Sequence, residues 1–569
     1  MTLLAWFQLI VFLALLLLTV RPLGGYMQRV FAGEATPLSP ILRPVEAGLY
    51  RLAGVRPEEE QDWFRYALAF LLLHLPGMVL LYLLQRLQDV LPLNPAGLPG
   101  VAPDLALNTA VSFATNTSWQ SYGGETTLSH FSQMAGIAMQ SFVSAGAGIA
   151  VAIALIRAFV RHGQETIGNF WADLTRAVLY VLLPVCVVAG LFFAWQGVPQ
   201  TLAGSAAAVT LEGANQSIAM GPVASQEAIK LLSGDGGGFF NAQSAHPFEN
   251  PTALTNLLSM LLMPLIGAAL TNCFGRMAGD ERQGWALLAA MLALLLAGAV
   301  ALHAAEGAAN PLLAGTGIDH HAGNLEGKEL RFGIPGSALF SELGTATSSG
   351  AVNAMHDSYM PLGGLTMMIN MMLDEVIVGG PGSGLYGMLL YALVAVFIGG
   401  LMIGRTPEYV GNKIEARDVK LAMLAILAVP AGLLLLTAVA VVLPAGLSAL
   451  GNAGPHGFSE VLYAYTSAVN TNGSAFAGLS ANAPFYNLTL ALAMAFGRFF
   501  VIVPVLALAG SLAAKRRVPA SAGTLPTTGP LWVGLLTGVI VIVGGLSYFP
   551  ALALGPLAEH LAMMGGVVS

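Results

Sequence analysis

Four short polar runs decide the fold predicted for this chain: Phe113-Ala-Thr-Asn-Thr-Ser-Trp-Gln120 (run 1), Leu232-Ser-Gly-Asp-Gly-Gly-Gly-Phe-Phe240 (run 2), Gly344-Thr-Ala-Thr-Ser-Ser-Gly350 (run 3) and Tyr465-Thr-Ser-Ala-Val-Asn-Thr-Asn-Gly473 (run 4). Each run is rich in Thr, Ser, Asn or Gly, follows a short and mildly apolar segment, and precedes a long apolar stretch. Four runs of similar character in matching positions predict an internal repeat of membrane span, re-entrant segment and membrane span.

The composition of the whole chain is that of a membrane protein. Of its 569 residues, 56% are hydrophobic and 9% are charged, whereas soluble proteins carry about 25% charged residues. This argues against a soluble enzyme, a nucleic-acid-binding protein and a disordered scaffold, and predicts an all-α polytopic membrane protein. Ten apolar stretches are long enough to cross a bilayer, and they begin near Leu3, Tyr66, Phe131, Asp173, Leu254, Trp285, Leu362, Lys420, Phe485 and Leu531.

These stretches and runs divide a single membrane domain over residues 1–569 into four repeats between two flanking helices. We expect the first flanking helix at 1–30 and the last at 529–555. The expected repeats are 66–160, 171–275, 285–404 and 419–514, and their pore loops are 104–122, 225–242, 337–354 and 459–477.

The basic residues predict the orientation of the chain, because Lys and Arg concentrate in cytoplasmic segments. With the N-terminus outside, the inner segments contain 18 of the 23 Lys and Arg residues. An even number of spans then places both termini on the extracytoplasmic side of the bacterial plasma (inner) membrane.

The runs have the composition of a cation site without acidic ligands. Irregular backbone at membrane depth survives only where it is buried in protein or lines a polar path, and rings of backbone carbonyls can replace the hydration shell of an ion. The short segments before the runs are predicted helices that start at Asp104, Ser225, Ser337 and Ser459, because such residues favour helix N-termini. Their C-terminal ends carry partial negative charge. We therefore predict a site for a monovalent cation.

Longer motifs around the runs resemble those of one family. They are Thr115-Asn-Thr-Ser-Trp-Gln-Ser-Tyr122, Gly236-Gly-Gly-Phe-Phe-Asn-Ala242, Ser244-Ala-His-Pro-Phe-Glu-Asn-Pro251, Gly350-Ala-Val-Asn-Ala-Met-His-Asp357, Gly404-Arg-Thr-Pro-Glu-Tyr409 and Asn472-Gly-Ser-Ala-Phe-Ala-Gly478. Across essentially its whole length the chain resembles the potassium-binding subunits of bacterial Kdp potassium-transporting P-type ATPases.

The resemblance implies four membrane-pore-membrane repeats around a central selectivity filter, as in Trk/Ktr-type potassium transporters. It further implies that extracytoplasmic K⁺ binds there and passes through an intramembrane tunnel to an ATP-hydrolysing subunit. The implied partners are that P-type ATPase subunit (KdpB-like), a single-span accessory subunit (KdpC-like), a small membrane peptide (KdpF-like) and membrane lipids; no nucleic acid is expected.

The resemblance also implies which residues form the filter. They are Asn116, Thr117, Ser118, Gln120, Gly236, Gly237, Gly238, Ser349, Gly350, Asn472 and Gly473. Gln120 matches a family position that affects K⁺ affinity. The chain departs from some relatives at Ser118 and Asp235, where they have Asn, and at Ser349, where they have Cys. We expect Asp235 at the pore mouth, where a carboxylate would strengthen cation attraction.

Ionisable residues inside apolar stretches are candidates for the ion path, because they are costly in a membrane. Glu375 and Arg498 match positions that line the family's tunnel; alternatively they form a buried structural pair, or Asp374 and Glu375 face water at a helix break. The glycine-rich segment 379–387 predicts such a break in the seventh span, beneath the filter. Its glycine pattern lacks the preceding strand of a dinucleotide site.

No catalytic motif supports an enzyme in this chain alone. The sequence has no phosphate-binding loop, no Asp-Lys-Thr-Gly phosphorylation motif and no Gly-x-Ser-x-Gly nucleophile motif. We therefore expect a non-catalytic subunit that binds no nucleotide. A stand-alone Trk/Ktr-type potassium channel or symporter is the alternative, and a secondary transporter or membrane enzyme for organic substrates is a third class.

Overall fold

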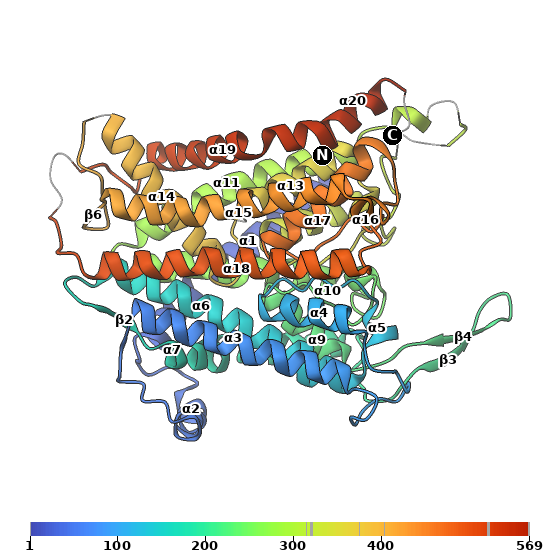
Figure 1. The fold of residues 1–569 in the computed structure, drawn as a ribbon, viewed down its shortest axis with the longest axis horizontal. Coiled ribbons are helices and arrows are strands. Elements are labelled where there is room, and N and C mark those ends of the chain that lie inside the picture. Colours follow the sequence, from blue (N-terminus) through green and yellow to red (C-terminus); the bar gives the residue numbers. More distant parts are fainter. Residues whose placement is uncertain are drawn as a thin grey trace.

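The computed structural model describes residues 2–313, 316–318, 322–374, 376–402, 404–519 and 524–566. In these residues, ten helices are long and apolar enough to cross a membrane, and they run side by side along the longest axis of the molecule (Figure 1). The ten predicted spans are thus confirmed in number. They are α1 (Leu3–Phe31), α3 (Trp63–Arg86), η1 with α6 (Ser132–Ala138, Met139–Val160), α7 with η2 and α8 (Phe170–Arg176, Ala177–Leu182, Leu183–Trp195), α10 (Ala253–Met277), α11 (Glu281–Glu306), α14 (Ser383–Met402), α15 (Ala416–Val442), α18 (Pro484–Ala513) and α19 (Pro530–Leu552).

Short elements connect these spans. Three antiparallel strand pairs are β1 with β2 (Gln61–Asp62, Thr166–Gly168), β3 with β4 (Ala206–Val209, Asn215–Ile218) and β5 with β6 (Glu408–Tyr409, Asn412–Lys413). Short helices outside the spans include α2 (Ser39–Ala53), α5 (Gly124–Thr127), η3 (Gln243–Ala245), η4 (Pro311–Leu313), η5 (His356–Ser358), α16 (Pro444–Leu447), η6 (Ala553–Leu557) and α20 (Ala558–Met564).

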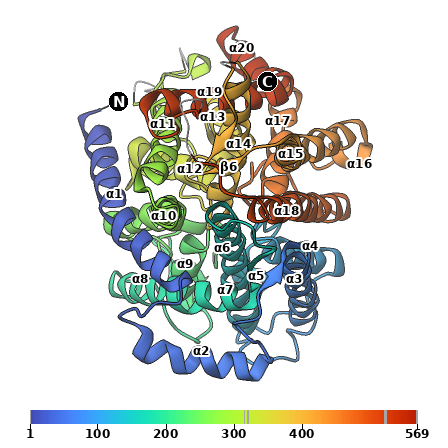
Figure 2. The ribbon, with the colours of Figure 1, turned by 90° about the vertical axis from the view of Figure 1, so that its left-hand side faces the viewer.

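Burial separates central from peripheral spans. Figure 2 looks along the helices and shows α6, α10, α14 and α18 around the centre, with α1, α3 and α15 at the periphery. In the most apolar window of each span, 89% of residues are buried in the helix that contains α6, against 28% in α1 and in α3. A helix that is apolar on all sides and buried belongs to the interior, whereas an exposed one faces lipid. The centre is therefore the place for a protected polar path.

Four shorter helices precede the polar runs: α4 (Pro103–Ala114), α9 (Val223–Leu232), α12 (Gly333–Ala346) and α17 (Gly454–Val469). None of the four predicted starts is an N-cap: Ala102 caps α4, and Ser225, Ser337 and Ser459 lie inside their helices. Asp104 lies in the first turn of α4, after Pro103. In α4 and α17 a proline occupies one of the first two helical positions, which its fixed φ and missing N–H suit.

The seventh predicted span is broken, as its glycine-rich segment predicts. α13 (Pro361–Met372) ends before a loop, and α14 begins only at Ser383. Within this loop, Val378, Gly379 and Gly382 have positive φ, which a continuing helix cannot contain. The membrane-spanning part of this segment is therefore α14, and α13 is a separate helix.

Both ends of the described chain lie at the end of the molecule where the short helices begin. Thr2 lines a cavity together with His303 and Gly307 at the end of α11. Glu559 in α20 contacts His456 in the first turns of α17. Because both ends of the described chain lie at the same end of the helix bundle, the chain crosses the bundle an even number of times.

Candidate ion-binding site

The four short helices end in the same backbone conformation. The second residue after each helix is left-handed: φ is 62° at Asn116, 58° at Gly234, 61° at Ser348 and 59° at Thr471. In three of the runs the following N–H turns back to the helix, with Thr117 N to Ser112 O at 2.9 Å, Asp235 N to Lys230 O at 3.1 Å and Asn472 N to Ser467 O at 2.9 Å. The left-handed residue at such a helix end is normally glycine. Of the four runs, only run 2 has glycine at this position, Gly234.

Beyond these turns the runs contact one another in order. A Cβ on Gly236 would lie 2.0 Å from Ser349 O in run 3. A Cβ on Gly350 would lie 2.1 Å from Asn472 O in run 4, and one on Gly473 would lie 1.9 Å from Thr117 O in run 1. Such approaches leave no room for a side chain. Three glycines at matching positions therefore bring three neighbouring pairs of runs together through their backbones.

Polar side chains also join the runs, and these contacts include the one neighbouring pair, runs 1 and 2, for which no glycine contact has been described above. Asn116 Nδ2 donates to Ser233 O at 3.3 Å and to Gly234 O at 3.0 Å, which joins run 1 to run 2. Ser348 Oγ donates to Thr471 O at 3.1 Å, which joins run 3 to run 4. Together with the glycine contacts, these bonds close the four runs into one ring.

Gln120 lies at the outer side of this ring. Its Oε1 accepts a hydrogen bond from Gly238 N at 3.0 Å, and Gly237 packs against Phe113. Gln120 and Gly473 both line an open cavity of about 720 Å³. The cavity is lined by residues of runs 1, 2 and 4 and of the segments that follow all four runs.

A buried ionic triad supports run 2 and was missed from the sequence. Lys230 Nζ lies 2.8 Å from Glu227 Oε2 and 2.7 Å from Glu249 Oε2, and all three side chains are at most 1% exposed. Glu249 also accepts a hydrogen bond from Phe240 N at 2.8 Å, and Ser244 Oγ donates to Glu227 at 2.8 Å. The Glu-x-x-Lys spacing of Glu227 and Lys230 was the available signal in the sequence, since i,i+3 residues share a helix face.

The loop between α13 and α14 lies directly behind the ring. A Cβ on Gly234 would lie 2.6 Å from Pro381, and one on Gly380 would lie 2.9 Å from Ser348. Gly379 N donates to Ala346 O, the last residue of α12, at 3.2 Å. This close packing places the loop across the inner side of runs 2 and 3.

Arg498 occupies the same inner side. With Asp374 and Thr471 it lines a cavity of about 50 Å³, and one guanidinium nitrogen donates to Ser144 O at 3.0 Å. Asp374 Oδ2 accepts a hydrogen bond from Tyr391 at 2.8 Å. Glu375, the other expected tunnel residue, lies outside the described residues.

Asp235 does not lie at the pore mouth, where we expected it. Its side chain is 0% exposed, and its backbone continues the turn that ends α9. The side chain of the matching Asn472 turns back to the last turn of α12, where its Nδ2 donates to Gly344 O at 2.9 Å. The helix-end turn decides this orientation, and a sequence pattern alone does not show on which side of a turn a side chain lies.

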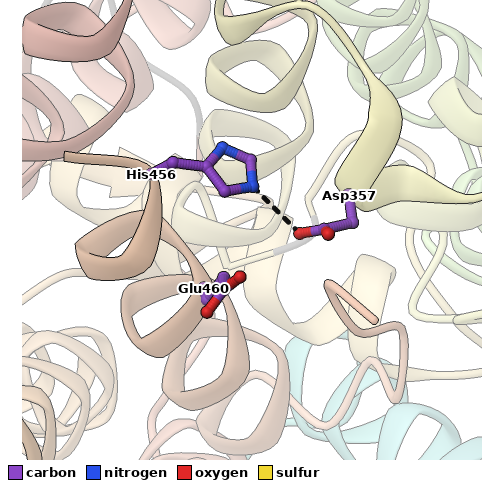
Figure 3. A group of neighbouring side chains, drawn as sticks. All are labelled: Asp357, His456 and Glu460. Carbon is purple, nitrogen blue, oxygen red and sulfur yellow. Dashed lines mark hydrogen bonds and ion pairs between the residues drawn. The ribbon is translucent and has the colours of Figure 1, made fainter. Parts of the chain in front are cut away.

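Three ionisable side chains meet at the outer end of α17 (Figure 3). His456 and Glu460 lie one turn apart, and Asp357 faces them from η5, with His456 Nε2 3.2 Å from Asp357 Oδ1. His456 Nδ1 lies 2.8 Å from Glu559 Oε1. Burial alone lowers the pKa of His456, but its hydrogen bonds to Asp357 and Glu559 raise it to about 10.

This spacing could hold a metal ion, because ligand atoms of Asp357, His456 and Glu460 lie within 4.8 Å of one another. Both imidazole nitrogens are already paired with carboxylates, however, and both can donate only when the ring is protonated. The arrangement therefore favours an imidazolium that ties α17 to η5 and α20.

Comparisons with known proteins agree with this architecture. The family model described as "Potassium-transporting ATPase A subunit" matches residues 10–561. The potassium-binding subunit of the potassium-transporting ATPase of Methylorubrum populi is 64% identical over 566 residues, which cover 100% of this chain and 99% of that protein. The subunit of the same name from Mesorhizobium japonicum is 61% identical, with 100% of both chains covered.

Among solved structures, the potassium transporter TrkH from Vibrio parahaemolyticus matches with a TM-score of 0.52 and 15% identity. The match covers 88% of this chain and 98% of that one. At this identity the likeness concerns the fold, which is thus of the Trk/Ktr type that we expected. The family model and the relatives, each spanning nearly the whole chain, show that the chain belongs to the family of potassium-transporting ATPase A subunits.

Proposed function

We propose that this chain is the K⁺-selecting membrane subunit of an ATP-driven potassium uptake complex, and that the ring of four runs is its selectivity filter. The observation that carries the proposal is the repeated left-handed turn after each short helix, followed by glycines that bring neighbouring backbones into contact. Alternation of backbone handedness aims successive carbonyls to one side. Rings of such neutral oxygens suit a dehydrated monovalent cation.

The expected filter residues have distinct roles in this proposal. Backbone carbonyls of Thr117, Ser349 and Asn472, each of which touches a neighbouring run's glycine position, are proposed ligands. Gly236, Gly350 and Gly473 permit the close approach. Asn116 joins two runs, and Gln120 holds Gly238 at the mouth. The remaining expected filter residues, Ser118, Gly237 and Gly238, complete the walls.

The fourfold organisation follows from the same geometry. We propose repeats at 66–160, 171–275, 285–404 and 419–514, with flanking helices at 1–30 and 529–555. The outer cavity would admit K⁺ from the extracytoplasmic side, where both termini would lie. The loop between α13 and α14, Arg498 and Glu375 would control passage into an intramembrane tunnel.

ATP hydrolysis is proposed to occur in a different subunit. The printed names of the relatives place those proteins in a potassium-transporting ATPase. For this chain we propose assembly with a P-type ATPase subunit, a single-span accessory subunit and a small membrane peptide in the plasma membrane. No nucleotide site is proposed for this chain.

Reconstitution distinguishes this proposal from a stand-alone channel or symporter. Liposomes that contain this chain alone should show no sustained K⁺ flux, whereas liposomes with the complete complex should show K⁺-stimulated ATP hydrolysis. Rapid K⁺ flux through the isolated chain would instead support the stand-alone alternative. A binding site that organic solutes displace more readily than Rb⁺ would support the third class.

A further inference from the structure

A buried carboxylate lies behind the ring without a direct partner. Asp235 is 0% exposed, and neither of its carboxylate oxygens accepts a hydrogen bond from the part of the chain that the structure describes. Matching residues in two other runs are neutral and bonded: Thr117 Oγ1 lies 2.8 Å from Thr115 Oγ1, and Asn472 Nδ2 donates to Gly344 O at 2.9 Å. Run 2 therefore differs from these runs in charge and in bonding.

The carboxylate is held close to the ring. Its own N–H donates to Lys230 O at 3.1 Å, so the backbone of Asp235 is part of the rigid end of α9. Its neighbour on one side, Gly234, packs against Pro381, and its neighbour on the other side, Gly236, packs against Ser349. The backbone of Asp235 therefore cannot move away from the ring without movement of the runs packed against Gly234 and Gly236.

A buried carboxylate without hydrogen bonds is strongly unfavourable unless positive charge lies nearby. Burial is the largest influence and raises the pKa of Asp235; the hydroxyl of Ser141 and the guanidinium of Arg498 act in the opposite direction and favour the ionised carboxylate, as a cation in the ring also would. Arg498 donates one hydrogen bond to Ser144 O, and its Nε has no hydrogen-bond partner among the described residues. One diffuse interaction with Arg498 leaves the negative charge of Asp235 incompletely compensated, and the ring beside it is the proposed place of a cation.

We propose that Asp235 determines the ion affinity of the filter: its charge acts across the backbone of run 2, stabilises the cation in the ring and offsets the repulsion that Arg498 exerts on that cation. This inference rests on the proposed function. A cation in the ring is then attracted more strongly toward run 2 than toward the other three runs. Asp235 touches no ion in this arrangement and acts through space.

The test is Asp235→Asn in the complete complex, because Asn keeps the shape and removes the charge. At an effective dielectric constant of about 20, a unit charge changes the affinity for a monovalent cation by about tenfold or more out to a separation of about 12 Å, and Asp235 is the chain neighbour of Gly236, whose Cβ position lies 2.0 Å from Ser349 O in the ring. We expect K⁺-stimulated ATP hydrolysis to need at least about ten times more K⁺. Asp89→Asn removes the same charge at an exposed position outside the four runs. This control should leave the K⁺ dependence of ATP hydrolysis unchanged.

A thermal unfolding series separates this role from a structural one. Without K⁺, the Asp235→Asn complex should unfold at the same or a higher temperature than the wild type, because an unpaired buried charge is removed. At saturating K⁺ the wild type should gain more stability than the variant, because its bound ion is held more tightly. A variant that is less stable without K⁺ would overturn the proposal, and so would an unchanged K⁺ dependence.

The substitution Gly473→Ala distinguishes a failure of the filter assignment from a failure of the proposed role of Asp235. If it weakens the K⁺ dependence while Asp235→Asn does not, the filter stands and the role of Asp235 is refuted. If neither substitution alters the K⁺ dependence, the filter assignment itself is wrong.

Discussion

Gly473→Ala is the sharpest perturbation of the ring. A Cβ on Gly473 would lie 1.9 Å from Thr117 O and 3.1 Å from Ser118 C. Because real Cβ contacts stay beyond 3.0 Å, the two runs must separate by about 1 Å. Gly473 also has φ of +96°, a conformation that costs a residue with a side chain about 1–3 kcal/mol.

In the variant, the strain and the clash raise the free energy of the ion-binding form of the ring. The population of that form falls, and the apparent affinity falls by the same factor. At about 1.4 kcal/mol per tenfold change, strain alone predicts a loss of about 5- to 100-fold in apparent K⁺ affinity. The clash with Thr117 O adds to this loss, because it displaces a proposed ligand.

The assay is K⁺-stimulated ATP hydrolysis by the purified complex over a range of K⁺ concentrations. Gly454→Ala is the matched control: Gly454 begins the short helix before the same run and has φ of +70°, but nothing lies within 4 Å of its Cβ position. We expect a modest loss of stability and no change in K⁺ dependence for this control. A wild-type K⁺ dependence in Gly473→Ala would refute the assignment of run 4 to the filter.

Three further predictions concern the surroundings of the ring. Lys230→Met should lower the free energy of unfolding by about 3–5 kcal/mol, because it leaves Glu227 and Glu249 buried without their cation; a melting temperature equal to that of the wild type would contradict the role of the triad. His456→Phe should destabilise the complex at pH 6.5 but not at pH 10. A histidine whose folded pKa is raised from 6.5 to about 10 contributes its full stability below pH 6.5 and loses it as the pH rises toward 10; equal destabilisation at both pH values would exclude the imidazolium tie. Gly382→Ala should place a Cβ 2.1 Å from Gly148 O and so reduce turnover at saturating K⁺, while Gly534→Ala, with no atom within 4 Å, should leave turnover unchanged.

Much of the architecture could be predicted from residue patterns. Apolar stretches of sufficient length predict spans, and the ten spans were found. The glycines at 379–382 predicted the break that separates α13 from α14. The starts of the short helices were less predictable: the serines at the expected starts were poor markers, because α9, α12 and α17 begin at Val223, Gly333 and Gly454 and the serines lie inside them.

The site could be predicted only in part, for a physical reason. Polar residues and glycines at Asn116, Gly236, Gly350 and Gly473 mark irregular backbone, and the structure gathers them into one ring. Which glycine touches which neighbouring carbonyl depends on contacts between residues more than 100 positions apart. No local pattern contains that information.

By itself, the sequence determined a chain of about ten membrane spans with four polar interruptions, because apolar length and the cost of exposed backbone in lipid are local properties. Only the tertiary structure decided that the runs close into a ring, that Lys230 is buried between two glutamates, and that Asp235 lies behind run 2 rather than at the mouth. These are consequences of how the helix ends converge. Packing of the chain decides on which side of a turn a charged side chain lies and which other charges face it.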